Sequence, residues 1–159
     1  MAPGRAEPGR GLPGGSLVAL DTSCLIALVC GWHEHHAATI AAVEKRLDGG
    51  AGLTLAAPAL VEAYSVLTRL PAPHRLSTTD ALHLLRENFQ KHARTVALGA
   101  NDYWSLLRTA PTNGISGGRT YDAVIAACAR KARARELLTL NLRHFESFGD
   151  DSLLITSPA

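Results

Sequence analysis

The strongest constraint on the fold of this chain is the alternation of short apolar runs with longer amphipathic segments. Five apolar runs have the length and composition of buried strands, at residues 17–20, 53–56, 95–98, 137–140 and 153–155. The segments between them show the apolar spacing and end signals of helices, at about residues 24–30, 34–47, 58–70, 77–89, 101–109 and 120–133. Strands that alternate with helices form βαβ units. We therefore predict an α/β fold of three layers, with a central, mostly parallel sheet flanked by helices.

The length of the chain and the composition of its N-terminus indicate how many domains it has and where the domain begins. The chain has 159 residues, the usual size of one domain. Residues 1–15 are rich in Gly, Pro, Ala and Arg and have too little apolar surface to order themselves. We predict a flexible N-terminal tail over residues 1–15 and a single domain over residues 16–159.

The cysteines and the hydropathy pattern bear on the compartment. Cys24, Cys30 and Cys128 have apolar neighbours and no CxxC spacing, which favours packed, reduced thiols. No apolar run reaches the roughly 18 to 20 residues of a membrane helix, and the N-terminal stretch has no apolar core of a signal peptide. We predict a cytoplasmic protein with no membrane partner.

The positive charge is small but unevenly distributed. The net charge of +2 predicts no partner by itself. Basic residues gather in one stretch, at Arg119, Arg130, Lys131, Arg133 and Arg135. Such a cluster suits a phosphate backbone. It suits a solvated helix face equally well, and the sequence leaves both interpretations open.

Three acidic residues stand inside otherwise apolar segments. Asp21 follows the first predicted strand, Glu62 lies in a helix with a proline start, and Asp122 lies in the first turn of a later helix. Ligand sites in parallel α/β folds form beyond the carboxyl ends of the strands, where Asp21 and Asn141 both fall. Acids are seldom buried unless they pair with a cation or bind a metal, and converging carboxylates favour Mg²⁺ or Mn²⁺. The alternative is that each acid caps a helix or pairs with an arginine.

Hydroxyl, histidine and aromatic side chains give weaker signals. Thr22 and Ser23 offer hydroxyls that suit the cap of the next helix, and Ser23 alternatively hydrogen-bonds Asp21. The histidines at 33, 35 and 36 lack the HExxH spacing of a zinc site, which favours a polar helix start. Helical spacing favours core packing over base stacking for three aromatic residues, Tyr64, Tyr103 and Trp104.

Four segments together resemble the motifs of PIN domains, in particular the VapC-type toxins of toxin–antitoxin pairs. The segment DTSCLI at residues 21–26 resembles the opening motif, and Glu62 in its proline-started helix matches the second acid. The segment GGRTYDAVIAA at residues 117–127 resembles the third-acid segment, and LTLNLRHF at residues 138–145 resembles the closing motif. The four occur in the family's order and spacing, and the resemblance covers about residues 16–155.

The resemblance implies a PIN-like fold and a metal-dependent endoribonuclease, the toxin component of a type II toxin–antitoxin pair that hydrolyses RNA phosphodiester bonds. The residues that carry over as ligands of Mg²⁺ or Mn²⁺ are Asp21, Glu62 and Asp122. In the closing motif Asn141 and His144 stand where many relatives have Asp, which weakens a second metal site. Asn141 still offers a carbonyl oxygen, and we count it as a fourth catalytic position.

The resemblance also implies the partners. These are an RNA substrate, a cognate antitoxin that covers the acidic site with an arginine, and a homodimer within the toxin–antitoxin complex. As candidate substrate-binding residues we name Arg119, Ser23 and Thr139. A salt bridge with a neighbouring acid is the alternative role of Arg119.

Two other functions stay open from the sequence. A phosphoryl-transfer domain also has an Asp after a strand, but an aspartyl phosphatase has a second Asp two residues later, where this chain has Ser23. A receiver domain has a further acid pair before its phospho-acceptor strand. A non-catalytic nucleic-acid-binding module is compatible with the altered closing motif.

Overall fold

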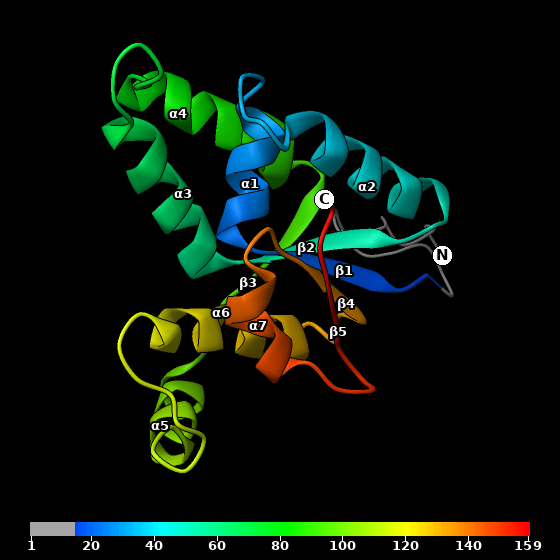
Figure 1. Ribbon diagram of the computed structural model, residues 1–159, viewed down its shortest axis with the longest axis vertical. Coiled ribbons are helices and arrows are strands. Elements are labelled where there is room, and N and C mark those ends of the chain that lie inside the picture. The colour runs from blue at the N-terminus through cyan, green and yellow to red at the C-terminus, as the bar shows by residue number, and fades with distance from the viewer. Residues whose placement is uncertain (1–14) are drawn as a thin grey trace, which may run out of the picture.

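Five parallel strands form the sheet at the centre of the structure (Figure 1). The computed structural model describes residues 15–159. Its strands are β1 (Leu17–Leu20), β2 (Gly52–Ala56), β3 (Ala93–Val96), β4 (Glu136–Leu138) and β5 (Leu154–Thr156). Their order is β3-β2-β1-β4-β5, and every neighbouring pair is parallel. This confirms the predicted parallel sheet, and it rules out the receiver alternative, whose strand order is 2-1-3-4-5. The tail predicted for residues 1–15 lies outside the described residues except for Gly15.

Helices cover both faces of this sheet, as predicted. On one face lie α1 (Thr22–Val29), α2 (His36–Asp48), α3 (Ala57–Arg69) and α4 (Thr78–Leu85), which continues into a π-helical turn (Arg86–Gln90). On the other face lie α5 (Ala100–Thr109), α6 (Arg119–Lys131) and α7 (Leu142–Phe145), which is followed by a short 3₁₀ turn (Glu146–Phe148). None of the described helices is both long enough and apolar enough to cross a membrane.

Burial in the core explains why the inner strands β1, β2 and β4 lie in apolar stretches of the sequence. Leu20, Leu55 and Leu137 are almost completely buried, because helices cover the sheet from both sides. All three cysteines are buried and free, as predicted for packed thiols. β1 is the central strand, so its carboxyl end, where Asp21 follows, lies in the interior of the molecule.

Two strand predictions are displaced by tertiary contacts. β4 ends at Leu138 rather than at residue 140, because the Leu140 amide leaves the ladder and donates to Ser23 Oγ at 3.0 Å. β3 spans Ala93–Val96 rather than 95–98, because its register with β2 pairs Ala93 with Leu53. The short helix α7 and the turn after it were not predicted.

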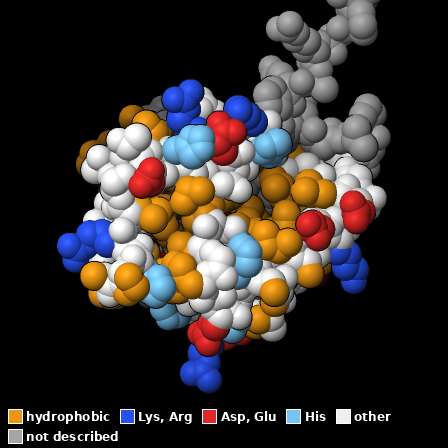
Figure 2. Space-filling model, turned by 90° about the horizontal axis from the view of Figure 1, so that it is seen from above, with side chains coloured by type: hydrophobic (Ala, Val, Ile, Leu, Met, Phe, Trp, Pro, Cys, Tyr) orange, Lys and Arg blue, Asp and Glu red, His pale blue; other side chains and the backbone are white. Residues whose placement is uncertain are grey.

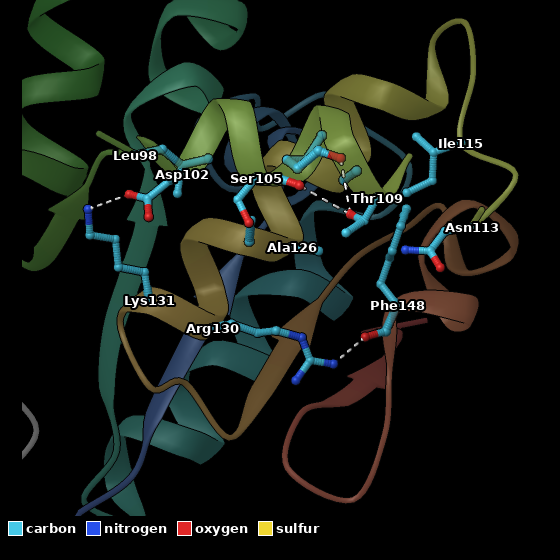
Figure 3. Close-up of a pocket in the computed structure, with 13 residues that line it drawn as sticks. Leu98, Asp102, Ser105, Thr109, Asn113, Ile115, Ala126, Arg130, Lys131 and Phe148 are labelled. Carbon is cyan, nitrogen blue, oxygen red and sulfur yellow. Dashed lines mark hydrogen bonds and ion pairs between the residues drawn. The ribbon is translucent and has the colours of Figure 1, made fainter. Parts of the chain in front are cut away.

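Helix α5 contradicts the expectation that its aromatic residues belong to the core. No residue of α5 is buried, and Trp104 is 63% exposed. Tyr103 is exposed as well, whereas Tyr64 on α3 is half-buried against the core. A cavity of about 360 Å³ separates α5 from α6, and alanines such as Ala126 and Ala127 form its α6 wall (Figure 3). The α5 residues that line this cavity include Ser105 and Leu106, whereas Tyr103 and Trp104 do not, so both rings stand outside the contact between α5 and α6.

An ion pair fastens α2 to the sheet. Arg46 Nε donates to Glu136 Oε2 at 2.8 Å, and Thr156 Oγ1 donates to Glu136 Oε1 at 2.6 Å. The hydrogen bond from Arg46 lowers the pKa of the Glu136 carboxyl. Both side chains are mostly shielded from solvent, so losing the arginine leaves a poorly solvated carboxylate.

We expect Arg46→Met to lower the free energy of unfolding by about 1–3 kcal/mol at pH 7. Lys91→Met is the control, because the Lys91–Glu87 pair is exposed and screened by solvent, so its loss should change the free energy of unfolding little. The folded-state pKa of Glu136 is lowered, so its stabilisation is present above the usual Glu range and is lost as the pH falls below it. The Arg46→Met deficit should therefore shrink in acid. Chemical denaturation from pH 3 to 7 measures this, and equal deficits for the two variants would contradict it.

Candidate active site

Asp21 stands at the junction of β1 and α1. It is 2% exposed and has the extended backbone of an N-cap residue. The Cys24 amide donates to Asp21 Oδ1 at 3.0 Å, so the Asp21 carboxylate caps α1. The prediction that the Thr22 or Ser23 hydroxyl would provide this cap is wrong, because both residues already lie within the first turn of the helix.

Two hydroxyl groups hold the Asp21 carboxylate in place. Ser23 Oγ donates to Oδ1 at 2.6 Å, which confirms the alternative predicted for Ser23, and Thr139 Oγ1 donates to Oδ2 at 2.6 Å. Each hydroxyl also accepts from the loop after β4: Ser23 from the Leu140 amide and Thr139 from the Asn141 amide at 2.9 Å. Both hydroxyl protons are thus committed to Asp21. This arrangement suits a positioning role for Ser23 and for the fully buried Thr139 rather than contact with a substrate.

Burial sets the protonation preference of Asp21. Loss of solvent raises the pKa of its carboxyl, and the hydrogen bonds from Ser23, Thr139 and Cys24 lower it without reversing the direction. The ionised form of Asp21 is therefore costly in the protein by itself, and a nearby cation would relieve that cost.

The three predicted acids line one cavity of about 250 Å³. Asp21 reaches it from the cap of α1, Glu62 from α3 and Asp122 from the first turn of α6. Thr22 Oγ1 donates to Glu62 Oε2 at 3.0 Å. Burial raises the pKa of the Asp122 carboxyl, and the charges of Asp21 and Glu62 raise it further, although His144 and Arg119 oppose them. The fold thus brings the acids near enough to feel one another's charge.

The closing segment and the α1–α2 loop complete the lining. Asn141 borders the cavity, and His144 Nδ1 lies 3.6 Å from Asp122 Oδ2. His33 also lines the cavity. The resemblance to PIN domains implies such a place for one histidine of this segment, although its spacing is not that of a zinc site. The contact between Thr22 and Glu62 could not be anticipated, since the two residues are 40 positions apart.

The basic residues lie elsewhere. The Arg119 guanidinium packs 5.0 Å from the centre of the Phe148 ring and donates to Ser147 Oγ, and Arg119 does not line the cavity. Arg130 pairs with Asp150. Lys131 pairs with Asp102 at 3.0 Å (Figure 3). Both basic residues belong to the last turn of α6, about 12 Å along the helix from Asp122. Arg119 thus contacts a serine and an aromatic ring rather than the neighbouring acid of the alternative prediction, whereas Arg130 and Lys131 are ion-paired within the fold.

The donor set can be tested against a divalent ion. Among residues 15–159, no group of three or more His, Cys, Asp or Glu side chains is close enough to hold a metal ion as arranged. The acids surround a cavity rather than form a tight ligand shell. Their chemistry nevertheless fits Mg²⁺ or Mn²⁺, because all three offer only oxygen ligands. Burial raises the pKa values of Asp21 and Asp122, so a cation bound beside them would favour their ionised forms.

Comparison with known proteins shows which proteins this chain is similar to. A family model described as PIN domain matches residues 18–150. Ribonuclease VapC40 of Mycobacterium tuberculosis is 39% identical over 132 residues, which cover 83% of this chain and 92% of the relative. The solved structure of Mycobacterium tuberculosis VapC20, described as a sarcin-ricin loop cleaving toxin, matches with a TM-score of 0.63 at 15% identity, over 84% of this chain and 97% of that chain. VapBC2 from Rickettsia felis, bound to a DNA fragment from its promoter, matches with a TM-score of 0.63 at 16% identity, over 89% of this chain and 98% of that chain.

The cost of the buried Asp21 charge predicts an unusual stability effect. We expect Asp21→Asn to raise the free energy of unfolding at pH 7 in EDTA, by on the order of 1 kcal/mol, because the amide keeps the cap acceptor and removes the charge. Asp102→Asn is the control, since Asp102 is exposed and its pKa is lowered by the Gly99 amide and Lys131. It should lose stability. Chemical denaturation measures both, and a loss of several kcal/mol for Asp21→Asn would show that the charge is structural.

Proposed function

This chain belongs to the PIN domain family, and we propose that it is a metal-dependent endoribonuclease, the toxin of a type II toxin–antitoxin pair, which hydrolyses RNA phosphodiester bonds. The observation that carries this proposal is the single cavity that Asp21, Glu62 and Asp122 line from three separate elements. These acids stand at the positions that match the family motifs. A relative with 39% identity over most of both chains bears the name ribonuclease.

In the proposed mechanism the residues of this chain prepare the site. Asp21 presents a carboxylate whose orientation is set by Ser23, Thr139 and the helix cap. Glu62 and Asp122 add negative charge from α3 and α6. Mg²⁺ or Mn²⁺, when bound, would polarise the phosphodiester and lower the pKa of an attacking water.

The rest of the cavity strengthens these charges. Apolar side chains, including Ile125 and Phe145, line the cavity beside the acids and lower the local dielectric constant. The Asn141 amide faces the same cavity and offers a neutral oxygen where many relatives have a carboxylate. We propose that Asn141 orients water or substrate there.

We propose a cognate antitoxin as the physiological partner. An arginine from such a protein would pair well with the uncompensated carboxylates of the cavity. The α1–α4 layer also offers apolar surface: Figure 2 shows apolar side chains gathered on this face with histidines at their border. An apolar groove between α3 and α4 includes Leu82, which is half exposed, and Tyr64. Burial of such surface against a partner is favourable.

We further propose a homodimer and a cytoplasmic location. The exposed apolar residues of α5, Trp104 and Leu107, give a second copy a surface to cover. The three free, buried cysteines suit a reducing compartment.

Metal-dependent cleavage is the direct test. The wild-type protein should cleave RNA with Mn²⁺ or Mg²⁺ and lose that activity in EDTA. Asp21→Asn and Asp122→Asn should each reduce cleavage by on the order of 100-fold or more while remaining folded. Asp102→Asn is the matched control, because it removes an exposed acid outside the cavity. An unchanged cleavage rate in a well-folded Asp21→Asn protein would refute the mechanism, and RNA binding without cleavage by the wild type would favour the non-catalytic module.

The same assay with Asn141→Asp gives the converse result. A fourth carboxylate at the cavity should lower the Mn²⁺ concentration needed for half-maximal cleavage by about 10-fold. If the Mn²⁺ dependence were unchanged, Asn141 would not contribute to the metal environment.

The partner proposal has its own test. We expect the small protein encoded next to this chain's gene to form a stable complex on co-expression and to suppress RNA cleavage. Because an arginine–carboxylate contact is proposed, Asp122→Asn should speed dissociation of that complex, whereas Asp102→Asn should not. Light scattering and surface plasmon resonance measure both. A co-expressed neighbour that leaves cleavage unchanged would contradict the proposal.

A further inference from the structure

We call the cavity that Asp21, Glu62 and Asp122 line the carboxylate cavity. A larger hollow continues from it along α3 and α6. It has a volume of about 820 Å³ and shares Glu62, Asp122 and Ile125 with the cavity. We call it the α3–α6 groove. Its α3 wall is a stripe of residues three or four positions apart that ends at Arg69, and its α6 wall includes Tyr121. Arg69 and Tyr121 therefore border the same hollow as Glu62 and Asp122.

Tyr121 is an exposed aromatic ring beside a site acid. It directly precedes Asp122 on α6, and 73% of its surface is open to solvent. The opposite wall of the groove presents Val61, which is 71% exposed. Neither the tyrosine nor the valine contributes to the core. An exposed ring that borders a nuclease cavity has the chemistry of a stacking surface for an unpaired base.

Arg69 supplies a cation farther along the same groove. It is the last residue of α3 and lies seven positions after Glu62, about 10 Å along the helix axis. Among the described residues it has no hydrogen-bond or ion-pair partner, whereas Arg119 is engaged with Ser147 and Phe148. Its guanidinium is therefore available to an anion in the groove, at a distance from the acids that would repel one.

We propose that the α3–α6 groove holds the single-stranded RNA segment beside the scissile phosphate, with Tyr121 stacked on a base and Arg69 bound to a backbone phosphate. This inference rests on the proposed ribonuclease function and extends it to the substrate class. The RNA must be single-stranded here because a ring can stack on a base face only where that face is free of a neighbouring base pair. Charge complementarity sets how the RNA lies in the groove: its phosphate is placed at Arg69, away from Glu62 and Asp122.

Binding of a labelled RNA tests the groove without cleavage. Every variant is made in the Asp21→Asn background and titrated, with Mn²⁺ present, against a fluorescein-labelled single-stranded oligoribonucleotide of randomised sequence. Tyr121→Ala should weaken binding by about 5- to 150-fold, the range for loss of one stacked base. Tyr121→Phe keeps the ring and should keep the affinity. A duplex of the same RNA should bind more weakly and should not respond to Tyr121→Ala.

The salt dependence of the same titration tests Arg69. Arg69→Ala should reduce the slope of log K against log salt concentration by about 0.7, the effect of one lost phosphate contact on single-stranded nucleic acid. Arg69→Lys should restore the slope. The matched controls are Leu154→Ala, which removes exposed apolar surface on β5, and Arg94→Ala, which removes a cation on β3; both lie outside the groove.

The outcomes separate this inference from the function on which it rests. If the wild-type protein cleaves RNA but Tyr121→Ala and Arg69→Ala bind like the controls, the groove assignment is wrong and the ribonuclease proposal stands. If Tyr121→Ala instead converts a dimer to a monomer in light scattering, the groove is a contact between copies of this chain and the inference is overturned. If the wild-type protein neither binds nor cleaves RNA, both proposals fall.

Discussion

The arrangement of the site depends on how one carboxylate is held at the end of the central strand. Asp21 directly follows β1 and caps α1 by accepting a hydrogen bond from the Cys24 amide. Its carboxylate also accepts hydrogen bonds from the hydroxyls of Ser23 and Thr139. Those hydroxyl oxygens in turn accept hydrogen bonds from the amides of Leu140 and Asn141. The loop after β4 is therefore held in place through the Asp21 carboxylate. Folding can tolerate the buried acid because each of its oxygens has donors, although burial still raises its pKa. The central strand, the first helix and the closing motif therefore share one anchor.

The acids of the cavity illustrate how a functional site opposes the stability of its own fold. Asp122 is partly buried and lies in the field of Asp21 and Glu62, which raises its pKa. Ordinary ion pairs elsewhere, such as Arg46–Glu136 between α2 and β4, stabilise the same domain. Among residues 15–159 no arginine lines the cavity, since Arg119 is turned toward Phe148, and the histidine at 144 is the basic side chain beside Asp122. The metal ion and the partner's arginine that we propose would each relieve the repulsion between these carboxylates.

The sequence contained most of the architecture because the strongest local signals coincide with the sheet. A strand buried on both faces must be apolar throughout, so the runs at β1 and β2 located these strands closely. The edge strands β3 and β5 are partly exposed, and the run at 95–98 overlapped only the second half of β3. The acids could be grouped because they interrupt such runs. Contacts between distant segments had no local signature, and one of them, the Ser23–Leu140 hydrogen bond, shortened β4. The cap of α1 was misplaced for a local reason, because Asp21, Thr22 and Ser23 are all favoured N-cap residues and the helix begins directly after Asp21. The exposure of Trp104 was not predicted either, because helical spacing alone does not show which positions of α5 face α6: Ser105 and Leu106 line the gap between the two helices, and Trp104 does not.

Helix α6 shows why a cluster of like charges in sequence need not act as one surface. Its first turn carries Asp122 at the cavity, and its last turn carries Arg130 and Lys131, which are paired with acids of neighbouring segments. The helix dipole favours both placements, acids at the amino end and bases at the carboxyl end. The length of the helix then separates the basic residues from the proposed chemistry, however close they stand to Asp122 in the chain. The cation that we propose for a substrate phosphate therefore lies on another element: Arg69 lines the adjoining groove at the end of α3.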